Sequence, residues 1–234
     1  MPGHFTFFTH QIDNGKALFD ENESRHALQV LRYGVGSQIE FTDGKGFLYK
    51  GRITETSKKF FVAQADEVIE PANLSKLSLA VGIIKHTDRL EWMVEKCCEL
   101  GVESLILMQT ENTVKARVSI ERLERICISA LKQSHGCRLP KLILEDFKTT
   151  VNRSAENRFI CHCRAELQNK SAKPNDLKGE TLVLIGPEGD FSVEEVKMAH
   201  ELGFTDLALG NTVLRTETAA MAVAGAYNLI GGNG

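Results

Sequence analysis

The chain has 234 residues, with 28 lysines and arginines, 31 aspartates and glutamates, and 42% apolar residues. This length predicts one or two domains, and the ordinary apolar content argues against wholesale disorder. No apolar run approaches the roughly 18 residues of a membrane span, and the N-terminus carries neither the basic nor the long apolar stretch of a secretory signal. We therefore expect a cytoplasmic protein without a membrane segment.

The six cysteines contain no C-x-x-C pair. Cys161, His162 and Cys163 are consecutive, but a structural zinc ion takes four well-spaced ligands, and no second ligand pair stands at such a spacing. We therefore expect no metal, and we interpret the cysteines as reduced, mostly buried thiols.

Charge is distributed unevenly along a chain whose net charge is −3. Residues 115–141 hold seven basic and two acidic side chains, a local charge of +5, whereas residues 175–234 hold three basic and nine acidic side chains, a local charge of −6. A phosphate contact therefore has to come from a local patch, and residues 115–141 are the candidate. A solvated helix face explains the same basic run equally well.

Residues 1–70 carry a β-rich pattern. Asp43-Gly44-Lys45-Gly46 is a strong hairpin turn signal. Strands are expected around this turn at 38–42 and 47–54, with a further strand at 59–65 and a short helix at 26–32. Pro71, Ala72 and Asn73 are the expected domain boundary, because proline interrupts regular structure.

From Leu77 onward, apolar runs of strand length alternate with helical patterns, which predicts a parallel sheet with helices on both faces. The expected strands are at 77–84, 102–109, 142–145, 158–162, 181–185 and 206–209. Asp88 is expected to cap a helix that Gly101 ends. Further helices are expected at 119–134, with Arg122, Arg125 and Lys132 pointing outward, and at 216–230.

Two glycine loops between an expected strand and an expected helix carry the candidate chemistry. In the first, LIGPEGDFS at 184–192, Ser192 and Glu195 form a capping box, and Gly186 and Gly189 let a ligand approach the backbone closely. The loop is neither a dinucleotide fingerprint nor a P-loop. It lies at the carboxyl end of a strand, where open α/β sheets bind ligands, although a simple turn is the alternative.

The second loop is LALGNTVLRTETAA at 207–220. The structural interpretation is that Thr216 is the N-cap of the helix and that Glu217 lies in its first turn, where it favours the helix dipole. Arg215 opposes the helix dipole, so we expect it to face an anionic partner, either Glu217 or a ligand.

Together, GPEGDFSVEE and LGNTVLRTETAA closely resemble the two signature segments of the bacterial ribosomal RNA small subunit methyltransferase E family, which are 16S rRNA uracil-N3 methyltransferases of the SPOUT class. Three further segments match in order: HALQVLR at 26–32, KHTDRLEW with ELGV at 85–102, and Gln133-Ser134 with Arg138-Leu139-Pro140. Five ordered matches are specific, and they cover nearly the whole chain.

The resemblance implies an α/β fold with a PUA-like β-barrel RNA-binding domain at 1–72 and a SPOUT methyltransferase domain at 73–234, whose parallel sheet contains a trefoil knot. It implies a homodimer with the active site at the subunit interface, and 16S rRNA of the small ribosomal subunit as substrate. S-adenosylmethionine is the implied cofactor, held among the knot loops with the strand end near His162 as a third wall.

The resemblance also assigns residues. The implied cofactor-binding residues are Ile185, Gly186, Pro187, Glu188, Gly189, Leu209, Gly210, Asn211, Val213, Leu214 and Thr216. The implied RNA-binding residues are Arg32, Lys85, Arg89, Arg122, Arg125, Lys132 and Arg138. For the chemistry, Arg215 is the candidate that stabilises negative charge on uracil, and Glu217 is the nearest candidate base, although capping explains Glu217 equally well. No metal is required, because the sulfonium is already a strong electrophile.

The chain departs from the family pattern near His4, at Thr212 and at Gly136, three places where arginine is common. Lys132, Arg122, Arg125 and His4 are the candidates that compensate. The alternatives are a SPOUT ribose 2′-O-methyltransferase, a non-catalytic RNA-binding module, which the missing arginines favour, and a zinc-dependent RNA-binding protein. The modified nucleotide, the choice between naked rRNA and the assembled subunit, and the general base stay open at this point.

Overall fold

The computed structural model describes residues 5–71, 74–113, 117–168 and 171–231. These residues form two compact units, one within 1–72 together with 128–139, and the other within 73–127 and 140–234. The boundary expected at Ala72 and Asn73 lies outside the described residues, as do His4 and Lys115.

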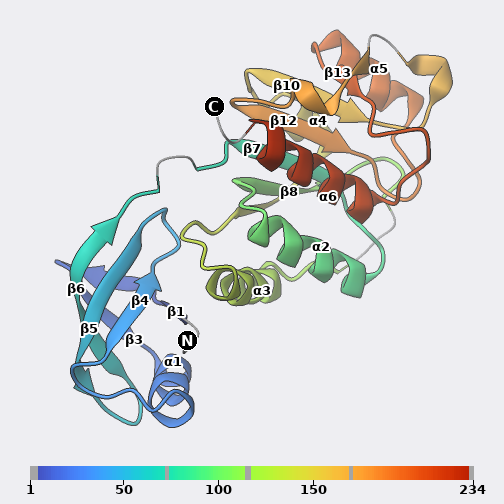
Figure 1. Ribbon diagram of the computed structural model, residues 1–234. Helices are drawn as coiled ribbons and strands as arrows, with labels where there is room; N and C mark the ends of the chain where they lie inside the picture. The colour runs from blue at the N-terminus through green and yellow to red at the C-terminus, as the bar shows by residue number, and fades with distance from the viewer. Residues whose placement is uncertain (1–4, 72–73, 114–116, 169–170, 232–234) are drawn as a thin grey trace. The chain divides into compact units, whose positions relative to one another are not determined.

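The first unit is built on a six-stranded sheet in which only β1 and β4 pair in parallel. The strand order is β1-β4-β5-β6-β3-β2. The strands are β1 (Thr6–Phe8), β2 (Gln11–Asp13), β3 (Lys16–Phe19), β4 (Gln38–Thr42), β5 (Leu48–Thr56) and β6 (Phe61–Ile69). Only Thr9 and His10 separate β1 from β2, although these strands form opposite edges, so the sheet has to curl to bring its edges together (Figure 1).

The interior of this curled sheet is filled by aromatic side chains. Phe7, Phe19, Phe41 and Phe61 are all fully buried, and the rings of Phe19 and Phe61 stack with centroids 4.2 Å apart. The helical segment between β3 and β4 starts earlier than predicted, as α1 (Glu21–Arg25), and continues as the π-helical turn η1 (His26–Val30). Asp20 caps α1 by accepting a hydrogen bond from the N–H of Glu23.

The end of α3 (Ile120–Gln133) and the residues that follow it belong to the first unit. Lys45 and Arg138 form an isolated antiparallel bridge there. The prediction that Lys132 points outward is wrong: its side chain is only 18% exposed, pairs with Glu23, and lies over the ring of Phe5. The reason is that the buried carboxylate of Glu23 needs a counter-charge.

The second unit is built on a seven-stranded sheet in which every neighbouring pair is parallel. The strand order is β11-β13-β10-β12-β7-β8-β9. The strands are β7 (Leu77–Gly82), β8 (Ser104–Gln109), β9 (Lys141–Asp146), β10 (Asn157–Cys161), β11 (Ser171–Ala172), β12 (Thr181–Ile185) and β13 (Thr205–Leu207). The central strand β12 is buried along its whole length, as expected for a parallel sheet covered on both faces.

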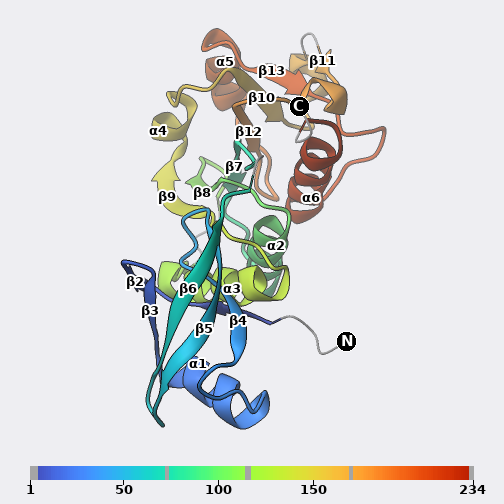
Figure 2. The same ribbon diagram turned by 60° about the vertical axis from the view of Figure 1, so that its left-hand side comes forward.

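Helices cover both faces of this sheet. On one face, Phe147 of α4 and Val196 of α5 pack in one apolar cluster with Ala80, Ile106 and Leu184 of the strands. On the other face lie α2 and α6, which pack against each other (Figures 1 and 2). The helices are α2 (Thr87–Glu99), α4 (Phe147–Val151), α5 (Val193–Glu201) and α6 (Thr216–Ala226), with short turns η2 (Ala165–Leu167), η3 (Pro174–Asp176) and η4 (Tyr227–Gly231).

The alternation of strands and helices predicted from the sequence is confirmed, but details at the element ends differ. Asp88 does not cap α2, because the N-cap position is His86 and Asp88 lies in the first turn. Gly101 follows the end of α2 with φ +67°, as predicted for a glycine stop. The last helix leaves α-helical geometry at Tyr227. The trefoil knot stays a prediction.

None of the helices in the described part of the chain is long and apolar enough to cross a membrane.

We expect Gly51→Ala to lower the free energy of unfolding by roughly 1–3 kcal/mol, because the added methyl group overlaps backbone atoms. Gly51 lies at an irregularity between β5 and β6, and a Cβ there would be 2.1 Å from the carbonyl oxygen of Gln64. Gly34→Ala is the matched control, because a Cβ at Gly34 has nothing within 4 Å. Denaturant unfolding of both variants checks this, and equal stability of the two would contradict it.

Candidate functional site

A cavity of about 700 Å³ lies at the carboxyl ends of β10, β12 and β13. Residues 160–163, 185–190 and 206–216 line it. Every residue implied to bind the cofactor is among the lining residues: Ile185, Gly186, Pro187, Glu188, Gly189, Leu209, Gly210, Asn211, Val213, Leu214 and Thr216. Three segments distant in the chain thus meet where open α/β sheets bind ligands.

The loop after β12 is held in a fixed shape. A Cβ on Gly82, at the end of β7, would lie 2.4 Å from the backbone nitrogen of Pro187, so only glycine permits this approach. Asp190 has φ +58°, a left-handed conformation that aspartate tolerates better than most residues. Its carboxylate accepts hydrogen bonds from the N–H of Phe191 at 2.8 Å and of Cys163 at 3.0 Å. The same side chain therefore joins this loop to the end of β10.

Two further groups fix the other side of this loop. The side-chain amide of Asn112 donates to the carbonyls of Gly189 and Asp190, at 3.2 and 3.1 Å. The predicted capping box is confirmed, since the Ser192 hydroxyl accepts from the N–H of Glu195 and the Glu195 carboxylate accepts from the N–H of Ser192. Helix α5 therefore starts at a defined position directly after the loop.

Thr216 connects the loop after β12 to the loop after β13. Its hydroxyl donates to the carbonyl of Gly186 at 2.9 Å, and both residues are buried. The prediction that Thr216 is the N-cap of α6 is wrong: Arg215 occupies that position, with extended backbone, and Thr216 is the first helical residue. The Thr216 hydroxyl instead serves as the donor to the carbonyl of Gly186, on the other loop.

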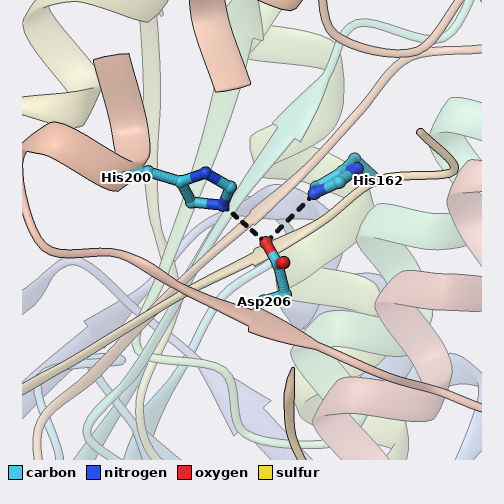
Figure 3. A group of neighbouring side chains, drawn as sticks. All are labelled: His162, His200 and Asp206. Atoms are coloured by element: carbon cyan, nitrogen blue, oxygen red, sulfur yellow. Dashed lines mark hydrogen bonds and ion pairs between the residues drawn. The ribbon is translucent and has the colours of Figure 1, made fainter. Parts of the chain in front are cut away.

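His162 and Asp206 line the cavity at its third wall, and both lie close to His200 of α5 (Figure 3). The Nε2 atoms of His162 and His200 lie 3.0 and 2.7 Å from Oδ1 of Asp206. The N–H of Arg164 donates to Nδ1 of His162 at 3.1 Å, so Nδ1 carries no proton and Nε2 is the donor to Asp206. One buried carboxylate thus links the end of β10, α5 and β13.

The same three side chains offer possible metal ligands within 4.8 Å of one another. The tautomer of His162 argues against a metal, because Nε2 would have to give up its proton to become a ligand. Burial raises the pKa of the neighbouring Cys161 thiol, which disfavours the thiolate that a metal would bind. We therefore interpret this group as a hydrogen-bond network, and the expectation that no metal is bound stays a prediction.

Arg89 of α2 lies between two carboxylates. Its Nε and Nη2 atoms donate to the two oxygens of Glu217 at 2.8 and 2.6 Å, and its Nη1 lies 3.5 Å from Glu188. The hydrogen bonds to Glu217 raise the pKa of Arg89. Burial alone would raise the pKa of Glu217, but the hydrogen bonds from Arg89 and from the backbone outweigh it and hold that pKa below its ordinary value. A bidentate ion pair thus connects the first turns of α2 and α6.

Arg215 lines the cavity and is exposed. Its expected partner Glu217 is held by Arg89 instead. Among the described residues, the Arg215 side chain has no hydrogen bond or ion pair. This arrangement leaves Arg215 as a cation at the cavity that is free to meet an anionic ligand.

Comparisons with known proteins agree with this geometry. The RNA methyltransferase domain family matches residues 70–228, and the RNA methyltransferase PUA domain family matches residues 19–66. The ribosomal RNA small subunit methyltransferase E of Bacillus subtilis is 30% identical over 220 residues, which cover 85% of this chain and 84% of that protein. The chain belongs to the ribosomal RNA small subunit methyltransferase E family.

Solved structures support membership in the methyltransferase E family and its two-part fold. A probable rRNA methyltransferase from Porphyromonas gingivalis aligns with a TM-score of 0.87 at 30% identity and covers 97% of this chain and 98% of its own. A ribosomal RNA small subunit methyltransferase E from Neisseria gonorrhoeae, bound to S-adenosylmethionine, aligns with a TM-score of 0.84 at 25% identity over 99% of both chains. The curled first sheet is therefore PUA-like, and the parallel sheet is that of an S-adenosylmethionine-dependent methyltransferase.

The seven cations expected to bind RNA in this methyltransferase E chain have different surroundings. Arg89, Arg122 and Lys132 already form ion pairs with acidic side chains, Arg122 with Glu91 at 2.9 Å. Arg32, Lys85 and Arg125 are exposed, and Arg138 is half-buried. Arg32 and the Lys132–Arg138 segment belong to the first unit, and the other cations belong to the second. Their role in RNA binding stays a prediction.

Sequence reasoning missed several residues that line the methyltransferase cavity. They are Ile160, Cys161, Cys163, Gln168, Ser171, Asp190, Asp206, Leu207, Ala208, Thr212 and Ala219, together with Arg89, which was assigned to RNA. Asp190 carried a signal, because an aspartate between a glycine and a helix N-cap is a common turn residue. Asp206 of β13 carried none, since its partner at the cavity, His162, is 44 residues away in the sequence.

We expect Asp206→Ala to lower the free energy of unfolding by roughly 1–3 kcal/mol, because it leaves two imidazole donors without their shared acceptor. Asp206→Asn keeps an acceptor oxygen in place and should cost less. Denaturant unfolding of the two variants measures the difference. Equal losses would mean that a neutral acceptor oxygen at this position does not support the hydrogen bonds from His162 and His200.

Proposed function

We propose that this chain catalyses transfer of a methyl group from S-adenosylmethionine to N3 of a uridine in 16S rRNA of the small ribosomal subunit. The observation that carries the proposal is one cavity that both signature loops of the methyltransferase E family line, with Arg215 among the lining residues. We assign the reaction to the cytoplasm, where small subunits assemble in bacteria.

The cavity residues fit the cofactor. A volume of about 700 Å³ lies within the usual range of small-molecule sites. Ile185, Leu209 and Leu214 offer apolar surface to an adenine ring, and Gly210, with φ +141°, leaves the backbone of its loop open for hydrogen bonds. When bound, S-adenosylmethionine supplies a methyl group on a positively charged sulfur, which keeps the electron pair of the broken bond.

The residues at the cavity have to make N3 of uracil a nucleophile. N3 is an imide nitrogen, so it must lose its proton, and negative charge then spreads over the neighbouring carbonyl oxygens. Arg215 is the group we assign to stabilise this charge, because its guanidinium is at the cavity and unpaired among the described residues. N3 also lies on the Watson–Crick edge, so the target base has to be unpaired or splayed out.

We assign RNA binding to the PUA-like unit and to the exposed cations Lys85 and Arg125 of the second unit. We also propose a homodimer whose active site is completed at the subunit interface. Exposed apolar side chains support it: Val213, on a loop that lines the cavity, is 81% exposed, and Leu229 is 82% exposed. We assign these two side chains to that interface.

The reaction is tested by transfer of label from S-adenosylmethionine to small subunits that lack the modification, followed by nucleoside analysis. We expect 3-methyluridine as the product, and naked 16S rRNA assayed in parallel identifies the substrate form. A 2′-O-methylated nucleoside would replace the proposal with ribose methylation. Cofactor binding without any transfer would point to a different RNA, and loss of both would favour a non-catalytic RNA-binding protein.

We expect Arg215→Ala to lower turnover by roughly 100- to 1,000-fold, the usual effect of removing one group that stabilises transition-state charge. The affinity for S-adenosylmethionine should change little. Arg215→Lys is the matched control, because it keeps the charge and should recover part of the rate. Single-turnover kinetics and calorimetric cofactor binding provide the two readouts. Full turnover in Arg215→Ala would remove Arg215 from the mechanism.

A further inference from the structure

Two glutamates contact Arg89, and their surroundings differ sharply. Glu188 lies on the loop after β12, between Pro187 and Gly189, and its side chain is 38% exposed. Glu217 lies in the first turn of α6, and its side chain is 9% exposed. Glu188 lines the cavity, whereas Glu217 is not among the lining residues.

Glu217 is poorly placed to accept a proton. Both of its oxygens accept hydrogen bonds from Arg89, at 2.8 and 2.6 Å, and protonation would break this bidentate pair. The same hydrogen bonds, together with one from the backbone, keep its pKa below the ordinary value even though burial alone would raise it. A carboxylate held in this way is a weak base, and it keeps its arginine partner in place.

Glu188 is better placed. Among the described residues, its contact to a charged group is with Nη1 of Arg89, at 3.5 Å, which orients the carboxylate without occupying both oxygens. Arg89 keeps its bidentate partner Glu217 in any case. The fixed loop backbone, held by Asn112 and by Gly82 beneath Pro187, sets the position of this side chain.

We propose that Glu188 is the general base that accepts the N3 proton of the target uridine, and that Glu217 is a positioning residue that holds Arg89 against Glu188. This inference rests on the proposed function. The N3–H bond breaks and its proton goes to a carboxylate oxygen of Glu188. The electron pair left on N3 forms the new bond to the methyl carbon, and Glu188 then releases the proton to water.

Charged groups surround Glu188 on several elements of the second unit. Arg89 faces it from α2, Glu217 lies behind Arg89 at the start of α6, and Arg215 lines the cavity from the loop after β13. Asp190 follows two residues later on the same loop, and its carboxylate is held by backbone N–H groups. Arg89 is thus the cation that contacts the Glu188 carboxylate directly, at 3.5 Å.

Glu188→Gln and Glu217→Gln are the matched pair that tests this assignment, each with wild type as reference. Three properties are measured: the single-turnover rate between pH 6 and 9 with nucleoside analysis, calorimetric affinity for S-adenosylmethionine, and melting temperature. Each variant replaces one carboxylate by an amide of nearly the same shape, so the two differ only in which carboxylate is lost.

For Glu188→Gln we expect a rate loss of roughly 100-fold or more at neutral pH, a much smaller loss of cofactor affinity, and a melting temperature close to wild type. Its rate should rise about tenfold per pH unit, because solvent then has to remove the N3 proton, whereas the wild-type rate should rise less steeply. A Glu188→Gln variant with the wild-type rate and pH profile would overturn the inference.

For Glu217→Gln we expect a lower melting temperature, because Arg89 loses its bidentate partner, and a pH–rate profile with the wild-type shape. The folded-state pKa of Glu217 is depressed, so the pair stabilises the protein above the ordinary glutamate pKa of 4.5, and this stabilisation is lost as the pH falls through the lower folded-state value. The difference in melting temperature from wild type should therefore shrink on acidification. A solvent-dependent pH profile in this variant would make Glu217 the base instead.

The wild-type product separates the two levels of the proposal. If wild type forms 3-methyluridine and Glu188→Gln is unimpaired, the assignment of Glu188 fails while the proposed function stands. If wild type methylates a different atom, the proposed function fails and the assignment falls with it.

Discussion

The buried hydrogen bond from Thr216 to Gly186 sets the relation between the two loops that form the cavity. The carbonyl of Gly186 lies directly past the end of β12, where no neighbouring strand continues the ladder, and a buried carbonyl without a partner is costly. Thr216 supplies that partner from the first residue of α6. Successive helical positions are about 100° apart, so once Thr216 faces Gly186, Glu217 has to face different surroundings, and Arg215, with extended backbone, lies before the helix. This contact therefore fixes where the two neighbours of Thr216 lie: Arg215 lines the cavity, and Glu217 pairs with Arg89.

Local signals in the sequence predicted much of the second unit, and interactions between distant residues account for the errors. The capping box of Ser192 and Glu195 was predictable because its two members are three residues apart. Thr216 was assigned to the wrong role because its acceptor is 30 residues away, and Lys132 because Glu23 is 109 residues away. The family resemblance identified the cavity-lining loops, but neither spacing nor resemblance indicated which acid each basic side chain pairs with.

The same limit affects the electrostatic interpretation of the chain. The count of basic residues in 115–141 suggests a strong positive patch. In the structure, however, Arg122 pairs with Glu91 and Lys132 with Glu23, so these two charges are compensated locally. The effective positive surface therefore consists of fewer cations than the sequence contains. In a protein with a net charge of −3, the positive surface of this segment therefore depends on individual exposed side chains such as Arg125 rather than on the sum of the segment.

Two carboxylates of the same chemical type acquire different properties because one guanidinium contacts both of them unequally. Arg89 engages Glu217 through two short hydrogen bonds and Glu188 through one longer contact. The first arrangement favours the ionised form of the buried Glu217, and the second leaves the carboxylate of Glu188 partly exposed at the cavity. Sites that transfer protons at neutral pH generally place two neighbouring acids in different environments, so that each acid has a different role. The cavity therefore needs both glutamates, one to hold the arginine in place and one whose carboxylate remains accessible to a substrate.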